Sequence, residues 1–178
     1  MAEMLSIIQQ LLVAGNETTT KMLTEMVRLL GEQPSRWEAL RSGETSPRDV
    51  VEETLRLSTP TQGMFRVVTR DTELGGVQLP AGSRVVAMYA AANRDPSVFD
   101  DADEFAPGRA NATDHLAFGT GIHYCVGAAL SRLEGRVAAE ELAARVASIE
   151  LGATNDFEYH PSFVLRGLIR LDVEFHSA

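Results

Sequence analysis

The feature that most constrains this chain is a ten-residue stretch, Phe118–Gly127, which holds the only cysteine of the protein. The stretch reads FGTGIHYCVG, and a proline-free run rich in Ala, Leu, Glu and Arg follows it. Apolar residues at helical spacing in that run predict a helix over residues 126–149. Cys125 should therefore lie at a helix N-terminus, where free backbone N–H groups and the positive end of the helix dipole favour a thiolate.

Two simpler interpretations of Cys125 compete with a specialised thiolate. A lone cysteine is most often a small buried apolar residue. A zinc site built on His123 and Cys125 would need three or four protein ligands, and the sequence shows no second cluster of cysteine and histidine. Against both stands the spacing Phe-Gly-x-Gly-x-His-x-Cys-x-Gly, which fixes six positions in ten.

This stretch resembles the haem-thiolate loop of the cytochrome P-450 family. The resemblance implies that the Cys125 sulfur is an axial ligand of the iron in haem b, iron protoporphyrin IX, and pushes electron density toward O–O cleavage. It also implies that Phe118 shields the sulfur and that His123 reaches a haem propionate. Gly119 belongs to the same cofactor-binding loop, and Gly127 resembles the small residue that lets the next helix lie close under the porphyrin.

The N-terminal part of the chain predicts one long helix over residues 4–30, because its apolar residues recur every three or four positions. A polar, β-branched insert, Ala14–Thr20, interrupts this pattern. Residues that disfavour a helix, placed inside an otherwise helical pattern, often mark a functional site. The simpler alternative is a solvent-exposed face or a kink of the helix that has no chemical role. Thr18 follows Ala14 by four residues, so its hydroxyl is expected to bond the Ala14 carbonyl and bend the helix.

Together with the cysteine loop, the insert resembles the family's distal helix, whose motif is Ala/Gly-Gly-x-Asp/Glu-Thr. The resemblance implies that Ala14 and Gly15 leave room for dioxygen over the iron. It assigns Glu17 and Thr18 as the acid–alcohol pair that delivers protons during dioxygen activation.

A second helix is predicted over residues 49–57, and it contains Glu53 and Arg56. An acid–base pair three residues apart is by itself a common surface salt bridge. Here it resembles the family's Glu-x-x-Arg pair, which implies that Arg109 completes a structural triad that locks the proximal loop. Residues so far apart in sequence would constrain the fold more than a local pair does.

Three basic residues are candidates for binding the haem propionates. Arg66 lies in a predicted strand just after the Glu-x-x-Arg helix, and His115 lies three residues before Phe118. The resemblance implies that these two, together with His123, neutralise both carboxylates through charge-assisted hydrogen bonds. The simpler interpretation of Arg66 is a cation on an edge strand.

Composition limits the partners and the location. A net charge of -9 argues against nucleic acid and against anionic membrane surfaces. No apolar run approaches the roughly 20 residues of a membrane span, and the first ten residues lack the features of a signal peptide. With a single cysteine, a disulfide framework is excluded. We therefore expect a cytoplasmic protein with neither nucleic-acid nor membrane partners.

The resemblance covers nearly all 178 residues. It implies a mainly α chain with small β-sheets (α+β), equivalent to about the C-terminal, haem-binding half of the family's catalytic domain. The expected segments of this single partial domain are the distal helix 4–30, the Glu-x-x-Arg helix 49–57, a β region 62–90, the haem-thiolate loop 115–127, the proximal helix 126–149 and a C-terminal β hairpin 157–176.

The implied activity is monooxygenation, in which one atom of dioxygen enters a small apolar organic substrate. Electrons would come from NAD(P)H through a ferredoxin or flavodoxin-type partner. Arg132 and Arg136 are candidates for docking that partner, and equally for ordinary solvated helix positions. The alternative is a truncated haem-binding or non-catalytic fragment that needs its N-terminal half.

Overall fold

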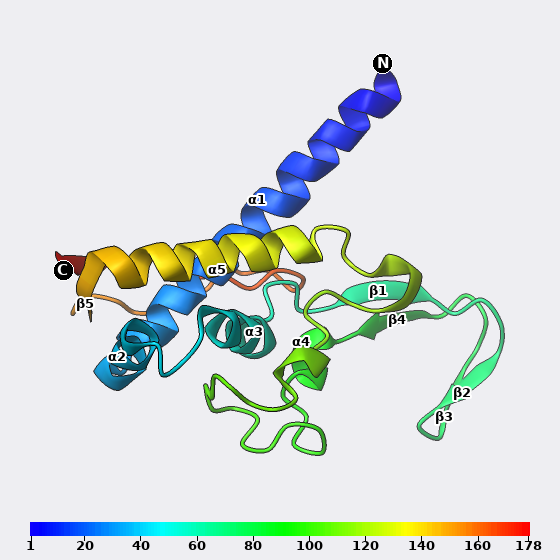
Figure 1. Ribbon diagram of the computed structural model, residues 1–178. Coiled ribbons are helices and arrows are strands. Elements are labelled where there is room, and N and C mark those ends of the chain that lie inside the picture. The colour runs from blue at the N-terminus through cyan, green and yellow to red at the C-terminus, as the bar shows by residue number, and fades with distance from the viewer.

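The computed structural model describes all residues from 1 to 178. It contains five α-helices and three two-stranded antiparallel sheets, so the expected mainly α fold with small sheets is confirmed (Figure 1). The helices are α1 (Ala2–Gly31), α2 (Pro34–Ser42), α3 (Pro47–Ser58), α4 (Tyr89–Ala92) and α5 (Ala128–Arg145). The paired strands are β1 (Met64–Val67) with β4 (Arg84–Ala87), β2 (Thr72–Leu74) with β3 (Val77–Leu79), and β5 (Val146–Leu151) with β6 (Val173–Ser177).

Local sequence explains where the first helices stop and start. Pro34 opens α2, where its missing N–H costs nothing, and Gly43 ends that helix in the left-handed conformation with φ 79°. Ser46 then caps α3 by accepting a hydrogen bond from the Asp49 backbone N–H at 3.1 Å. These signals bring α2 and α3 back against α1 as two short, well-defined helices.

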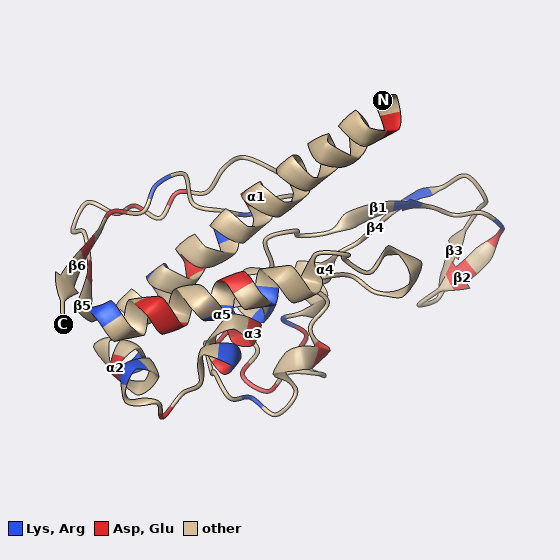
Figure 2. Ribbon diagram, turned by 45° about the horizontal axis from the view of Figure 1, so that its top comes forward, with Lys and Arg blue, Asp and Glu red and all other residues tan.

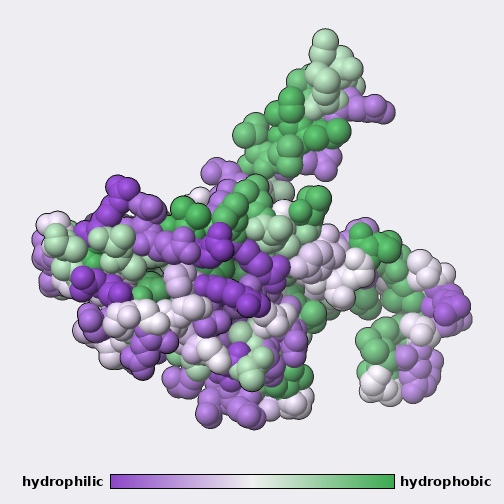
Figure 3. Space-filling model, in the orientation of Figure 1, coloured by the Kyte–Doolittle hydropathy of each residue, from purple (hydrophilic) through white to green (hydrophobic).

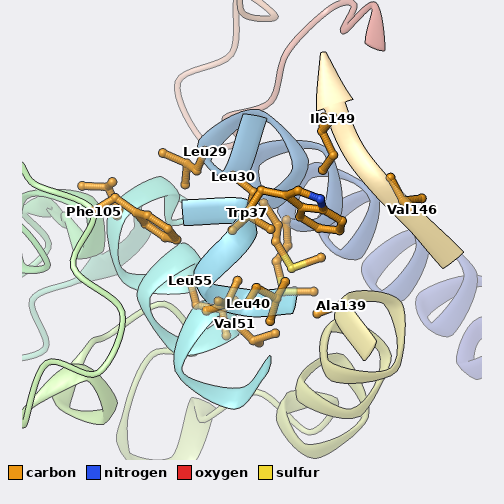
Figure 4. Close-up of a cluster of buried hydrophobic side chains, with 14 residues drawn as sticks. Leu29, Leu30, Trp37, Leu40, Val51, Leu55, Phe105, Ala139, Val146 and Ile149 are labelled. Carbon is orange, nitrogen blue, oxygen red and sulfur yellow. The ribbon is translucent and has the colours of Figure 1, made fainter. Parts of the chain in front are cut away.

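The hydrophobic core lies where α1, α2, α3, α5 and β5 meet (Figure 4). Only the C-terminal half of α1 contributes to it, through residues such as Leu29 and Leu30. Gly135 lets α5 approach closely, because an added Cβ would lie 3.0 Å from both a Met22 and a Val51 side-chain atom. Helix α3 is therefore enclosed, and every residue from Val50 to Ser58 is buried.

The predicted proximal helix 126–149 is wrong at its C-terminal end. Helix α5 runs from Ala128 to Arg145, and residues 146–151 form β5 instead. Val146 and Ile149 bury their branched side chains, and β5 pairs with β6 from the end of the chain. A non-local strand partner thus overrides the helical tendency of the preceding alanine-rich run.

The predicted C-terminal hairpin 157–176 is also only partly right. A narrow antiparallel turn is present, held by a bridge between Tyr159 and Leu168 and by a 3.0 Å bond from the His160 N–H to the Gly167 carbonyl. The regular strand of this region, β6, pairs with β5 and not within the segment. In the 62–90 region, β4 ends at Ala87, and Tyr89 begins α4. None of the helices has the length and hydropathy that crossing a bilayer requires.

Candidate functional site

The cysteine loop is a tight backbone turn that leads into α5. The Cys125 N–H donates to the Phe118 carbonyl at 3.0 Å, which closes the loop on itself. Gly119 and Gly121 have φ values of 68° and 69°, a conformation that favours glycine. Gly127 is the N-cap of α5, so Cys125 lies just ahead of the helix N-terminus, as the sequence predicts.

The outer face of this loop is apolar and uncovered. Cys125 is exposed, and the neighbouring Ile122 and Val126 are 97% and 98% exposed. The backbone N–H groups of Val126 and Gly127 donate to no acceptor in the chain. A thiol, two N–H groups without an acceptor and two exposed apolar side chains therefore occur close together in the sequence of this loop.

The predicted triad forms inside the fold. Arg56 and Glu53 are fully buried and make two parallel hydrogen bonds of 2.9 and 2.8 Å. Arg109 reaches the same carboxylate from the far side, with its Nε 3.3 Å from Glu53 Oε1. The structure thus brings these three side chains together, and the Glu53 carboxylate also accepts the Ala106 N–H at 3.0 Å.

Arg56 uses every hydrogen-bond donor of its guanidinium group. Besides the two bonds to Glu53, its Nη1 donates to the Asn93 and Ala102 carbonyls, each at 2.7 Å, and its Nη2 donates to the Glu104 carbonyl at 2.9 Å. These carbonyls belong to the segment that leads toward the cysteine loop. The triad therefore fixes the course of that segment against α3.

Two of the predicted propionate-binding residues are accessible to different degrees, since Arg66 is half-buried and His123 is exposed. Arg66, in β1, donates to the Tyr89 hydroxyl at 3.2 Å. The same hydroxyl is 3.2 Å from the position of a Cβ added to Gly119, so Arg66 and the loop are joined through Tyr89. His123 is exposed on the short 3-10 turn of the loop. Both basic side chains are thus at least partly accessible to an anionic group.

The distal motif lies on α1, which runs unbroken from Ala2 to Gly31. Thr18 donates to the Ala14 carbonyl at 2.7 Å, as its spacing predicts, but the helix is not interrupted there. Glu17 forms an ion pair with Lys21 at 3.1 Å, a contact that sequence reasoning did not anticipate. Gly15 is open, because an added Cβ would meet no atom within 4 Å.

The N-terminal half of α1 projects away from the core (Figure 1). Figure 3 shows it as an apolar protrusion at the surface. Its exposed large side chains are Met4, Leu5, Ile7, Ile8, Leu11, Leu12 and Val13. Exposed apolar clusters of this size mark a surface that another group covers.

Comparison with known proteins identifies the family to which this chain belongs. The sequence model of the family described as Cytochrome P450 matches residues 47–142. Cytochrome P450 109 of Bacillus spizizenii is 44% identical over 92% of this chain and 40% of its own length. This chain belongs to the cytochrome P450 family. The crystal structure of substrate-free cytochrome P450 CYP150A6 from Mycobacterium marinum superposes with a TM-score of 0.90 at 36% identity, over 94% of this chain and 43% of that one.

Other cytochromes P450 give the same result. Erythromycin C-12 hydroxylase from Saccharopolyspora erythraea is 39% identical over 92% of this chain and 41% of its own length. The structure of P450 OxyD superposes with a TM-score of 0.90 at 40% identity, over 96% of this chain and 43% of that one. The chain therefore spans about two fifths of the length of these P450 relatives.

Family membership implies a haem, and the residues at the open face fit one. A haem-thiolate site needs one sulfur donor, a flat apolar surface beside it and cations for the propionates. Cys125, the exposed Ile122 and Val126, and the cations Arg66 and His123 supply these three requirements. Gly127 leaves space next to the sulfur, because the only heavy atom near an added Cβ is Cys125 Sγ at 3.8 Å.

His115, which is predicted to contact a propionate, lies inside the fold beside Glu52. His115 is buried, and its Nε2 lies 3.0 Å from Glu52 Oε2. Its Nδ1 accepts the Ala117 N–H at 3.2 Å, so Nε2 must carry the proton that is donated to Glu52. Both ring nitrogens are thus paired within the chain, and a bond from His115 to a haem propionate, which stays a prediction, would require His115 to leave Glu52.

Sequence reasoning missed Glu52, which binds the proximal helix as well as His115. Arg132 Nε and Nη2 donate to the Glu52 carboxylate at 2.6 and 3.2 Å, and Arg132 Nη1 donates to the Tyr124 hydroxyl at 3.1 Å. Burial would raise the pKa of Glu52, but the hydrogen bonds from His115 and Arg132 outweigh it and lower that pKa to about 2. Glu52 therefore remains ionised under any physiological condition.

Proposed function

We propose that this chain forms the haem-binding part of a cytochrome P450 monooxygenase that inserts one atom of dioxygen into a small apolar organic substrate. The observation that carries the proposal is the exposed Cys125 at the start of α5, on an apolar face and inside a glycine-closed loop. A bound haem would supply the activation of dioxygen. What the residues of this chain do can be derived one by one.

Cys125 would donate its thiolate to the iron. The helix N-terminus that follows it and the free N–H groups of Val126 and Gly127 would stabilise the negative sulfur. Arg66 and His123 would bind the propionates and so fix the orientation of the ring. In this assignment the Glu53 triad stays structural, because its groups are buried and fully paired.

Thr18 and Glu17 would hold and move protons on the distal side. The Thr18 hydroxyl donates to the Ala14 carbonyl at 2.7 Å, so its oxygen lone pairs remain free to accept a proton or a water. Glu17 is half exposed in its ion pair with Lys21 and could rotate away from it at little cost. A proton path through this pair would therefore require the Glu17–Lys21 contact to open.

A redox partner would supply the electrons, and we propose a ferredoxin or flavodoxin-type protein that draws on NAD(P)H. Supporting this, a hollow of about 300 Å³ between α3 and α5 is lined by Arg48 and Arg136, together with Arg132, which is already paired with Glu52. Charged residues of both signs follow α5 along this side (Figure 2). In a chain of net charge -9, a local group of arginines favours an acidic partner.

The substrate class is supported by the relatives. One is named for hydroxylating erythromycin, and another structure holds corticosterone, so the names of both point to organic molecules as substrates or ligands. The single cysteine and the bacterial relatives are consistent with a cytoplasmic protein. The second candidate is a haem-binding chain without turnover of its own, which the uncovered apolar half of α1 favours.

The test is turnover with isotopically labelled dioxygen, NAD(P)H and a ferredoxin system, on haem-loaded protein. Incorporation of one labelled atom per product supports monooxygenation, whereas haem uptake without product supports the second candidate. Thr18→Ala should lower product formed per NAD(P)H consumed by at least several-fold. Thr20→Ala is the matched control, because Thr20 makes the same kind of bond, to the Asn16 carbonyl at 2.8 Å.

A further inference from the structure

The two ends of the cysteine loop meet at one buried carboxylate. His115 enters the loop and Arg132 lies one turn into the helix that leaves it, 10 residues before and seven residues after Cys125. Both bind Glu52, whose side chain is only 5% exposed. The adjacent Glu53 serves the structural triad, so consecutive residues of α3 hold two different parts of the proximal side.

Arg132 also contacts both aromatic residues of the loop. Its guanidinium group lies 4.6 Å from the centre of the Phe118 ring, and its Nη1 donates to the Tyr124 hydroxyl. Tyr124 immediately precedes Cys125, and the Phe118 carbonyl accepts the Cys125 N–H. The two aromatic rings also lie close together, with centroids 6.3 Å apart and planes tilted by 60°. Arg132 therefore connects α3 to the residues on either side of the sulfur.

We infer that Arg132, held by Glu52, is a positioning residue that sets the geometry of the Cys125 thiolate, and that it is not a free docking cation. This inference rests on the proposed haem-thiolate function. The different roles of Arg132 and Arg136 follow from their burial and pairing. The Arg132 side chain is 31% exposed, whereas the Arg136 side chain is 52% exposed and pairs only with Glu140 at 3.6 Å. Of the arginines around the hollow, Arg136 and Arg48 are then left for an acidic partner.

Arg132 supports the loop in three ways that a lysine could not combine. A planar guanidinium can bind a carboxylate through two N–H groups, donate a third to a phenol and stack on a ring. Its bond to Glu52 fixes the distance between α3 and α5, while its other two contacts fix Tyr124 and Phe118. Losing the group should loosen the loop locally and leave the rest of the core intact.

The first test uses the haem-free chain and follows hydrogen exchange of the Cys125 backbone N–H. Arg132→Gln should speed this exchange about tenfold or more, the loss expected for one charge-assisted hydrogen bond, relative to amides of α3. Arg136→Gln is the matched control on the same helix and should change nothing. Equal exchange in Arg132→Gln and the parent chain would overturn the inference.

The second test uses the haem-loaded protein, reduced and exposed to carbon monoxide during a mild urea titration. Arg132→Gln should convert from the thiolate-type to the neutral-ligand-type absorption band at lower urea than the parent, and Arg136→Gln should not. Arg136→Gln should instead weaken binding of an acidic ferredoxin more than Arg132→Gln does. The opposite pattern would make Arg132 a docking residue.

Tyr124→Phe keeps the inference testable if Arg132→Gln fails to fold. It removes only the hydroxyl that Arg132 holds, so the Glu52–Arg132 pair survives, and exchange at Cys125 should still rise measurably. No rise would overturn the inference. Failure of the proposed function looks different: the parent protein itself would then show no thiolate-type band, while the exchange data would still report whether Arg132 holds the loop.

Discussion

Helix α3 and the cysteine loop are linked through Glu52 and Arg132, yet they differ in which of their side chains are buried. In α3, the charged Glu53 and Arg56 are fully buried, and all donors of Arg56 are used. In the loop, the apolar Ile122 and Val126 are almost completely exposed beside an exposed thiol. The polar groups of the first region are paired within this chain, whereas the thiol and the apolar side chains of the second are left uncovered.

This contrast distinguishes residues that stabilise the fold from residues that are available for binding a cofactor. A buried ion pair is stable only when its geometry is good and its remaining hydrogen bonds are made, and α3 meets both conditions. The cysteine loop leaves its sulfur and two N–H groups without partners in the chain. Substitutions in α3 should therefore cost stability, and substitutions in the loop or on α1 should chiefly change the cofactor or the reaction.

The largest expected effect is that of Arg56→Ala. It would leave the Glu53 carboxylate buried with only Arg109 nearby, which should cost about 3–5 kcal/mol of unfolding free energy. Urea denaturation followed by circular dichroism measures this loss. Arg145→Ala is the control, since Arg145 pairs with Glu141 at the surface with 78% of its side chain exposed, and it should change stability by less than about 0.5 kcal/mol. Equal losses in the two variants would contradict the account of α3.

The second effect is acid destabilisation through Glu52. Its pKa is lowered in the folded state from 4.5 to about 2, so the stability it contributes is present above pH 4.5 and is lost as the pH falls toward 2. A shift of this size corresponds to about 3 kcal/mol. Glu52→Gln should therefore flatten the stability profile below pH 4.5, compared with Glu38→Gln at an exposed pair. If the two variants lost stability in parallel as the pH falls, His115 and Arg132 would not be lowering the pKa of Glu52.

A third and smaller effect compares two glycines of the cysteine loop. Gly119→Ala and Gly121→Ala should each cost about 1 kcal/mol, because both glycines have positive φ. Gly119→Ala should cost more, since its Cβ would lie 3.2 Å from the Tyr89 hydroxyl, whereas the Gly121 position is open. Thermal unfolding of the two variants measures the difference in their stability. A larger loss of thermal stability in Gly121→Ala than in Gly119→Ala would contradict the close approach of Tyr89 to Gly119.

The smallest expected effect on stability is that of Thr18→Ala. Its hydroxyl bonds a helical carbonyl at the edge of an exposed segment, and such bonds add little to a helix. The change in unfolding free energy should stay below about 0.5 kcal/mol in a thermal melt, while coupling of NAD(P)H to product falls. A large loss of stability would place Thr18 in the framework and remove it from the proposed proton path.

Sequence reasoning succeeded where one helix or one short loop sets the geometry. The Thr18–Ala14 bond and the Glu53–Arg56 pair follow from spacings of four and three residues, which place side chains on one face of a helix. The glycine pattern around Cys125 likewise predicted a tight loop before a helix. The fold class followed from these motifs and their order along the chain.

Apart from the contact of Arg109 with Glu53, which the family resemblance implied, sequence reasoning missed partners that lie far apart in the chain. The end of the proximal helix was misplaced because β6, more than 20 residues away, pairs with β5. The contact between His115 and Glu52 was missed because nothing in the sequence around His115 points to a partner 63 residues away. The ion pair of Glu17 with Lys21, four residues on, could have been predicted from helical spacing.

The most direct test of the central claim is the absorption spectrum of haem-loaded protein, reduced and exposed to carbon monoxide, with Cys125→Ser measured in parallel. A thiolate ligand predicts a strongly red-shifted Soret band in the parent protein and its disappearance in the variant, which should still be folded because Cys125 is exposed. A band typical of a neutral ligand in the parent, or a red-shifted band that survives Cys125→Ser, would contradict the assignment of Cys125 as the iron ligand.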